Sequence, residues 1–287
     1  MSRYYNQLRS AYEPTAPEAS VATRPLPAEI VTAPEPPPSD PKADFLRECP
    51  RLCIVPKAGT PLILGKANEF SSASDSYRAL RTRLVRVMAA KRIRSVVISS
   101  PLPAEGKTLT TMNLGLAFAN LEGRRVLVVD GDLRTTGLSR LFERYDGPGL
   151  QDVLQGQGSF ESVVRSTDVP GLFVVTGGAV STGTAEAFTS HRWKEFMSWA
   201  SESFDAVLVD APPILAMADF ELIAAGCDGA LLVVRALQTS REMLAKAVKQ
   251  VDAKKFLGLV FNRSNPRNDG GYYGYGAYGS AAPSLQA

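Results

Sequence analysis

A short apolar run that leads into a glycine-lysine-threonine turn restricts this chain to few folds. Residues 95–98, Ser-Val-Val-Ile, have the composition of a strand buried on both faces. Gly106-Lys107-Thr108 follows, and residues 109–120 have the composition of a helix. In such a strand-turn-helix unit, backbone N–H groups of the turn and of the helix start point to one place and can bind a phosphate. We therefore expect a phosphate-binding loop, in which Lys107 reaches the β- and γ-phosphates of a nucleotide and Thr108 binds Mg²⁺.

The loop departs from the usual spacing G-x-x-x-x-G-K-[ST], because Pro101 stands where the first glycine belongs. A bare Gly-Lys-Thr occurs often by chance, and a tight turn with a solvated lysine is the alternative interpretation. The position between an apolar strand and a helix favours the phosphate-binding loop.

Two further apolar runs end in aspartates. Residues 125–129 lead into Asp130-Gly131-Asp132, and residues 206–209 lead into Asp210. A single aspartate at such a place usually caps a helix or forms a turn. Three of them at the carboxyl ends of two strands, where parallel sheets have their ligand crevice, fit oxygen ligands of Mg²⁺. We expect the metal to be bound by Thr108, Asp130, Asp132 and Asp210.

Helix and strand patterns alternate along the chain, which predicts an α/β fold: a doubly wound, mostly parallel sheet with helices on both faces. The expected strands cover residues 95–99, 125–129, 172–176, 206–210, 230–235 and 256–261. The expected helices cover residues 72–90, 107–120, 137–143, 150–155, 191–203, 218–226 and 240–252.

The two ends of the chain differ in composition from its middle. Ten of the 20 prolines lie in the first 50 residues, so we expect residues 1–60 to be a largely disordered tail. Residues 266–287 are rich in glycine and tyrosine and form a second predicted tail. Residues 61–265 remain as one domain, long enough for a single doubly wound sheet.

Charge and cysteine content exclude some classes of protein. A net charge of +3 gives no support for nucleic-acid binding. Three cysteines without histidines nearby argue against zinc and suit a reducing cytoplasm. Since neither a signal peptide nor an apolar run of transmembrane length is visible, we expect a cytoplasmic protein.

The three motifs together resemble the Walker A, A′ and B motifs of bacterial tyrosine kinases (BY-kinases), which control capsule and exopolysaccharide synthesis. Lys107 and Thr108 match Walker A, Asp130 and Asp132 match the D-x-D of A′, and Asp210 matches Walker B. The resemblance covers about residues 71–262 and the tail. It implies a P-loop NTPase of the deviant Walker (SIMIBI) type that binds ATP and Mg²⁺, with Asp130 as the base and Asp132 supporting the metal or the acceptor.

The resemblance also suggests which residues contact the nucleotide, and where the chain departs from the family. Ala104 stands where the family usually has glycine, and residues 182–186 replace a turn that contains Asn-Pro. Asn262 resembles an adenine-contacting asparagine, although a strand-end turn residue is an equally good interpretation. The nucleotide-binding set is Ala104, Glu105, Gly106, Lys107, Thr108, Leu109 and Asn262.

The predicted helix before the first strand carries a possible subunit interface. Asp75, Arg78 and Arg81 resemble the family's E-x-x-R-x-x-R segment, which forms contacts in ring-shaped oligomers, with aspartate replacing glutamate. From the pattern alone, an ordinary amphipathic helix with solvated arginines fits as well. Ser72 and Asp75 have the spacing of a capping pair at its start.

Four of the nine tyrosines lie within seven residues of the tail, at Tyr272, Tyr273, Tyr275 and Tyr278. A sticky low-complexity tail is one interpretation. Next to a phosphate-transfer core, these residues resemble the family's autophosphorylation sites. The prediction is an ATP-dependent tyrosine autokinase that regulates exopolysaccharide or capsule synthesis and export. The family implies a separate membrane activator, through which this chain would lie at the inner face of the cell membrane, and a cognate phosphatase.

Two other functions stay open. A switch ATPase of the ParA/MinD type shares the fold and motifs, but has a signature lysine at the position of Leu102 and no need for a tyrosine-rich tail. A non-catalytic nucleotide-binding scaffold is suggested only by Ala104.

Overall fold

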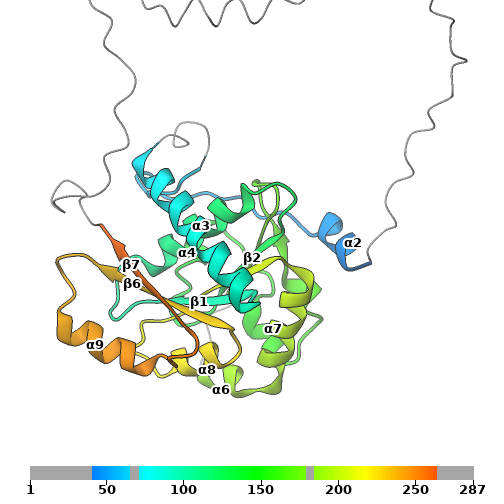
Figure 1. Ribbon diagram of the computed structural model, residues 1–287. Coiled ribbons are helices and arrows are strands. Elements are labelled where there is room, and N and C mark those ends of the chain that lie inside the picture. Colours follow the sequence, from blue (N-terminus) through cyan, green and yellow to red (C-terminus); the bar gives the residue numbers. More distant parts are fainter. Residues whose placement is uncertain (1–40, 65–70, 179–183, 264–287) are drawn as a thin grey trace, which may run out of the picture. The chain divides into compact units, whose positions relative to one another are not determined.

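The computed structural model describes residues 41–64, 71–178 and 184–263. Within this part the chain forms a seven-stranded sheet in the order β3-β4-β2-β5-β1-β6-β7, with helices on both faces (Figure 1). All neighbouring strands are parallel except β3, which runs antiparallel to β4. The strands are β1 (Ser95–Ser99), β2 (Val126–Asp130), β3 (Arg165–Ser166), β4 (Leu172–Val175), β5 (Ala206–Asp210), β6 (Gly229–Arg235) and β7 (Phe256–Asn262).

Helices cover the sheet in two layers, each with its own apolar core. On one face, α3 and α4 pack through Leu84, Met88 and Leu114. On the other, α5, α7 and α8 pack through Val153, Trp193 and Phe220. The helices are α2 (Pro41–Glu48), α3 (Ser72–Lys91), α4 (Lys107–Ala119), α5 (Leu150–Leu154), α6 (Thr184–Thr189), α7 (His191–Ser203), α8 (Asp219–Ala225) and α9 (Arg241–Gln250), with 3₁₀ turns η2 (Ser139–Leu141) and η3 (Glu161–Val163).

The central strands are apolar because both of their faces are covered. Every residue of β1, β2 and β5 is buried. Gly115 lets α4 lie close to β2, since a Cβ at this glycine would come within 2.6 Å of a Val128 methyl carbon. This close packing fixes the first turn of α4 at the carboxyl end of the sheet.

The parallel register brings two of the expected site residues side by side. Asp130, the last residue of β2, pairs with Asp210, the last residue of β5. β1 lies on the other side of β5 and leads into the glycine-lysine-threonine turn. The three motifs therefore meet at one edge of the sheet, as expected from the sequence.

The fold differs from the expectation near the amino terminus. Residues 41–60 are part of the folded unit, because Leu46, Leu52 and Ile54 are buried in the two cores. The Leu52 amide donates to the Ser166 carbonyl at 2.9 Å, which ties this segment to β3. The folded unit therefore begins well before the predicted boundary near residue 60. The high proline content indicated disorder, and the three buried apolar residues are too widely spaced to form a recognisable pattern.

Three smaller differences concern local structure. Neither β3 nor α6 was expected, because two- and six-residue elements give almost no periodic pattern. Ser71, rather than Ser72, caps α3, since its hydroxyl accepts from the Ser74 amide at 3.2 Å.

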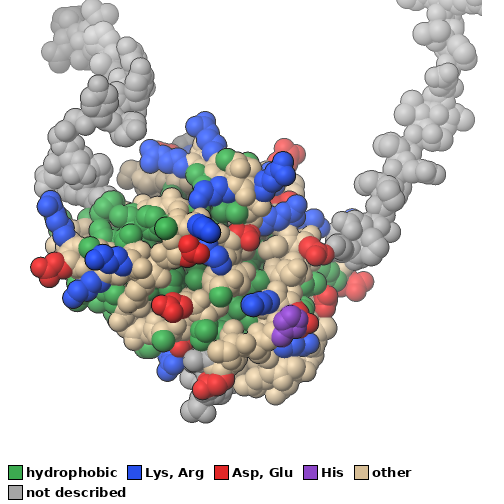
Figure 2. All heavy atoms as spheres, turned by 60° about the horizontal axis from the view of Figure 1, so that its bottom comes forward, with side chains coloured by type: hydrophobic (Ala, Val, Ile, Leu, Met, Phe, Trp, Pro, Cys, Tyr) green, Lys and Arg blue, Asp and Glu red, His purple; other side chains and the backbone are tan. Residues whose placement is uncertain are grey.

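None of the helices in the described ranges combines the length and the apolar character needed to cross a bilayer. On the face shown in Figure 2, lysines and arginines alternate with aspartates and glutamates, in keeping with the small net charge.

Candidate nucleotide-binding site

The loop between β1 and α4 has the backbone conformation of a phosphate cradle. Gly106 adopts φ +95° and caps α4, and a Cβ there would lie 2.1 Å from the Asn262 side-chain nitrogen. Only glycine fits this position. Ala104 also has a positive φ, 62°, which an L-residue adopts at some cost. Lys107, Thr108 and Leu109 form the first turn of α4, so their amides face the same space as the loop.

Lys107 is held inside the site by acidic groups. Its ammonium donates to Asp132 Oδ2 at 2.9 Å and lies 3.5 Å from Asp210 Oδ2. Only 8% of Lys107 is exposed. Burial disfavours its charge, but Asp210 and Asp132 outweigh this and raise the pKa of Lys107. The side chain is therefore a fixed positive charge at the place where phosphates are expected.

Asp210 has one oxygen in use and one without a partner. Its Oδ2 accepts a hydrogen bond from the Thr108 hydroxyl at 2.6 Å. Its Oδ1 is buried and accepts no hydrogen bond from any described residue. Burial raises the pKa of Asp210, while Lys107 and the Thr108 hydrogen bond lower it. A buried carboxylate oxygen of this kind is costly unless a cation binds there.

Asp130 is a fully buried acid of the site with a raised pKa. Its Oδ2 accepts from the Ser139 amide at 3.1 Å and from the Ser139 hydroxyl at 2.9 Å. Its Oδ1 is buried and has no hydrogen-bond partner in the described part of the chain. Burial, together with the nearby Asp210 carboxylate, raises the pKa of Asp130 to about 7. An acid with this pKa can accept a proton near neutral pH.

The carboxylate oxygens of Asp130, Asp132 and Asp210 are suitable ligands for a divalent metal, but they do not converge on one point. Across residues 41–64, 71–178 and 184–263, no three His, Cys, Asp or Glu side chains form a group suited to bind a metal ion. Asp132 binds Lys107, and Asp130 binds Ser139, so their oxygens point to different partners. The unpartnered Oδ1 atoms of Asp130 and Asp210 are hard oxygen donors, which is the chemistry that Mg²⁺ prefers.

Glu105 joins the loop to two distant segments. Its carboxylate accepts from the Leu102 amide at 3.1 Å and, through its other oxygen, from the Thr239 hydroxyl. Its backbone carbonyl accepts from the Asn262 side-chain amide at 2.9 Å. We call Glu105, Thr239 and Asn262 the loop clasp. The structure thus places Asn262 on the loop backbone, whereas the predicted contact with adenine stays a prediction.

The sequence did not point to Ser139 or Thr239 as site residues, because no motif contains them. Arg134, four residues after Asp130, pairs with Asp219 through Nε at 2.9 Å and forms a structural ion pair. The tyrosines at 272, 273, 275 and 278 lie outside the described residues.

The predicted interface residues lie on the first half of α3. Arg78 is 3.4 Å from Asp75 on the exposed side of the helix. Arg81 instead donates to the Ala117 carbonyl of α4 at 3.0 Å. Arg81 therefore also has a role within its own chain.

Comparison with known proteins decides the family. The model of the family "CobQ/CobB/MinD/ParA nucleotide binding domain" matches residues 97–273. Tyrosine-protein kinase YwqD of Bacillus subtilis is 34% identical over 205 residues, which cover 70% of this chain and 86% of that protein. The chain belongs to the bacterial tyrosine kinases. This confirms the resemblance based on the three Walker motifs.

Some other relatives of this chain are much longer. Tyrosine-protein kinase ptk of Acinetobacter johnsonii is 32% identical over 224 residues, which cover 77% of this chain but only 30% of that protein. The whole-protein properties of such relatives do not transfer directly to this chain.

Solved structures support the same assignment. The kinase domain of the Escherichia coli tyrosine kinase ETK superposes with a TM-score of 0.65 at 27% identity, covering 72% of this chain and 84% of that one. The septum site-determining protein MinD of Pyrococcus horikoshii, complexed with Mg-ADP, gives 0.50 at 25% identity, covering 61% and 72%. Both confirm the predicted fold, and the kinase domain is the better match.

Proposed function

We propose that this chain is an ATP-dependent protein-tyrosine autokinase that regulates exopolysaccharide or capsule synthesis and export. The observation that carries the proposal is the convergence of Lys107 with Asp132 and Asp210 beside the loop at the start of α4. Membership of the bacterial tyrosine kinases supports it.

Nucleotide binding uses groups that are already in place. The loop amides and the amides of the first turn of α4 would bind the β-phosphate. Lys107 would exchange its carboxylate partners for the β- and γ-phosphates. Thr108 and Asp210 would hold Mg²⁺, with Asp130 and Asp132 in support. The metal supplies positive charge that offsets the charge of the phosphates.

The transfer step needs a base for the tyrosine hydroxyl. The phenolic oxygen forms a bond to the γ-phosphorus, the bond from that phosphorus to the β–γ bridging oxygen breaks, and ADP leaves. We assign the phenolic proton to Asp130, whose unpartnered Oδ1 and pKa of about 7 suit this role. The proposed acceptors are Tyr272, Tyr273, Tyr275 and Tyr278.

We also propose an oligomeric state and two partners for this chain. Copies of the chain would form a ring through Asp75, Arg78 and Arg81. A separate membrane activator would hold the chain at the inner face of the cell membrane, and a cognate tyrosine phosphatase would remove the phosphates. Phosphorylation adds roughly −1.5 to −2 charges per tyrosine, so a phosphorylated tail would repel itself and loosen the ring.

Substitution of Lys107 tests the proposal. We expect Lys107→Met to lower transfer of radiolabel from ATP to the tail by at least ~100-fold, since one preorganised donor of this kind contributes about 3 kcal/mol. Lys249→Met, at an exposed position of α9, is the matched control. A phosphotyrosine blot of the wild-type protein separates a kinase from a switch ATPase or a scaffold, which would give no signal. Full labelling of Lys107→Met would contradict the site assignment.

A further inference from the structure

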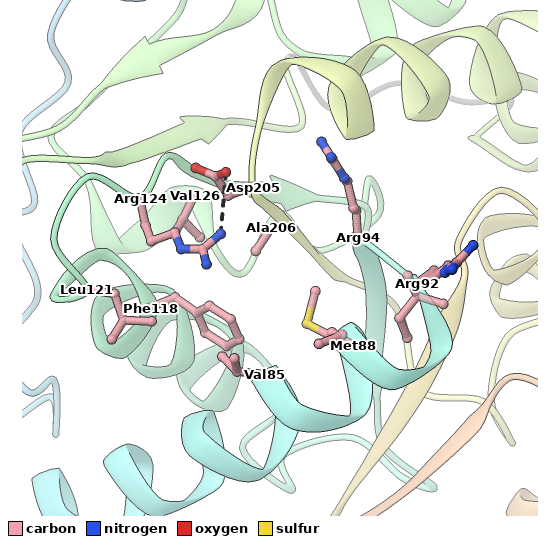
Figure 3. Close-up of a pocket in the computed structure, with 12 residues that line it drawn as sticks. Val85, Met88, Arg92, Arg94, Phe118, Leu121, Arg124, Val126, Asp205 and Ala206 are labelled. Atoms are coloured by element: carbon pink, nitrogen blue, oxygen red, sulfur yellow. Dashed lines mark hydrogen bonds and ion pairs between the residues drawn. The ribbon is translucent and has the colours of Figure 1, made fainter.

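A cavity of about 430 Å³ lies at the edge of the sheet opposite to the nucleotide site (Figure 3). It is bordered by the amino-terminal ends of three parallel strands, at Arg94, Val126 and Ala206. The carboxyl-terminal turns of α3 and α4 close its other side. The loop, Lys107 and the aspartates lie at the carboxyl ends of the same strands, so the two sites share no residue.

The wall of the cavity is apolar and continuous with the core. Met88, Phe118, Val126 and Ala206 line it and are nearly fully buried. In Figure 3, the Met88 sulfur and the Phe118 ring point into the space. A volume of this size, with such a wall, is in the range of small-molecule sites.

The rim of the cavity is positively charged. It carries Arg92, Arg94 and Arg124, all exposed, against a single acid, Asp205. Both oxygens of Asp205 are already used, one by the Arg125 amide at 2.8 Å and the other by Arg124 at 3.5 Å. Three guanidiniums against one carboxylate leave the rim with excess positive charge.

Other groups than the rim guanidiniums satisfy the carbonyls at the carboxyl-terminal end of α3. The Arg92 and Ile93 amides satisfy the last carbonyls of α3, at Ala89 and Met88. The Arg94 side chain donates to the Ser201 carbonyl on α7. In the part of the chain that the structure describes, no guanidinium of this rim donates to a carbonyl of α3 or α4.

We infer that this cavity binds an amphipathic organic anion: an alkyl or aryl body inside, and one carboxylate or phosphate on the arginine rim. The apolar wall accounts for the body, and Arg124 at the mouth, which uses one guanidinium nitrogen for Asp205, accounts for the acidic head. A free small molecule is the occupant that fits a side-chain-lined cavity of this volume. This inference does not depend on the proposed kinase activity.

Decanoate serves as the probe, in isothermal titration of the full chain below its micelle-forming concentration. We expect saturable one-to-one binding of decanoate, and at least tenfold weaker binding of decan-1-ol and of acetate, which lack the head and the body respectively. Absence of heat with decanoate, or equal affinity for decan-1-ol, would overturn the inference.

Two variants and a control locate the binding. Arg124→Gln should weaken decanoate at least tenfold. Ala89→Trp fills the mouth from an exposed helix position and should abolish binding. Arg86→Gln, exposed on α3 outside the cavity, should change affinity less than twofold. Thermal unfolding checks that each variant folds, and Ala89→Trp tests the cavity independently of Arg124. Equal losses in Arg86→Gln and Arg124→Gln would refute the site.

A vesicle experiment separates the two sources of such an anion. The wild-type chain is floated with phosphatidylglycerol vesicles in parallel with the titration. We expect the wild-type chain and Lys107→Met to bind decanoate in solution with the same affinity. We expect no association with vesicles that is lost in Arg124→Gln. Arg124-dependent flotation without binding of free decanoate would assign the cavity to a lipid surface and overturn the inference of a free ligand.

Discussion

Asp130 combines a buried position with a carboxylate neighbour, and the two raise its pKa to about 7. Below about pH 4 the group is protonated in both the folded and the unfolded chain. Between pH 4 and 7 the unfolded chain releases this proton while the folded chain keeps it, so the stability falls as the pH rises. Above about pH 7 the full penalty of a buried charge applies.

Asp130→Asn should therefore raise the thermal midpoint of the nucleotide-free chain at pH 8, and much less at pH 5. Each pKa unit corresponds to ~1.4 kcal/mol, so the gain at pH 8 is a few kcal/mol. Thermal unfolding in EDTA at both pH values measures it, with the exposed Asp146→Asn as the control. Added Mg²⁺ should stabilise the wild-type chain more than Asp130→Asn. Equal gains at both pH values would argue against a raised pKa.

Ala104 stands in a left-handed conformation, φ 62°, where its Cβ crowds the backbone. Ala104→Gly should raise the free energy of unfolding by up to ~1 kcal/mol, measured by urea denaturation. Ala90→Gly, in regular helix, is the matched contrast and should lower it by about the same amount. A loss of stability in Ala104→Gly would show that the loop is not strained at this residue.

Among the elements, the loop clasp links the turn after β1 to the segment that follows β6 and to the end of β7. Thr239→Val removes the hydroxyl that donates to Glu105 but keeps the side-chain shape. Because the loop would then be less well fixed before ATP binds, we expect KM for ATP to rise about tenfold with little change in kcat.

Steady-state kinetics with varied ATP measure this effect. Thr82→Val, which removes an exposed hydroxyl that donates to the Arg78 carbonyl within α3, is the control. An unchanged KM in Thr239→Val would mean that the clasp does not position the loop.

Local patterns explain which elements could be predicted. β1, β2 and β5 are buried on both faces, so their apolar sequences identified them directly. α2 and the segment around Leu52 were missed because they contact the core only at isolated positions. In the site, Lys107 and Thr108 could be predicted because they belong to a motif.

Ser139 and Thr239 belong to no motif. Ser139 lies nine residues beyond Asp130, and Thr239 lies 134 residues from Glu105. The Thr239 contact depends on the order of the strands, because β6 lies beside β1, and the Ser139 contact depends on the path of the chain after β2. No spacing in the sequence encodes either of them.

At the scale of the whole molecule, two arginines of α3 test the proposed assembly into a ring. Arg78 lies beside Asp75, with 37% of its side chain exposed, and Arg81 bonds to α4. If the proposed ring uses this helix, Arg78→Ala should lower the mass in solution with less than ~0.5 kcal/mol change in stability. Arg81→Ala should lower both the mass and the stability.

Light scattering and thermal unfolding read the two effects separately. Arg86→Ala, exposed later on the same helix, is the control and should change neither. A full-size assembly of Arg78→Ala would rule out this residue as part of the contact between copies.

β7 ends at Asn262, whose amide is bonded to the turn that would hold the phosphates. Tyr272 follows ten residues later, and ten residues span at most about 35 Å. The segment that leads to the proposed acceptor tyrosines thus begins beside the loop that would hold the phosphates. Its length alone would permit a copy to label itself, and in the proposed ring the choice between self and neighbour would depend on how the copies face one another.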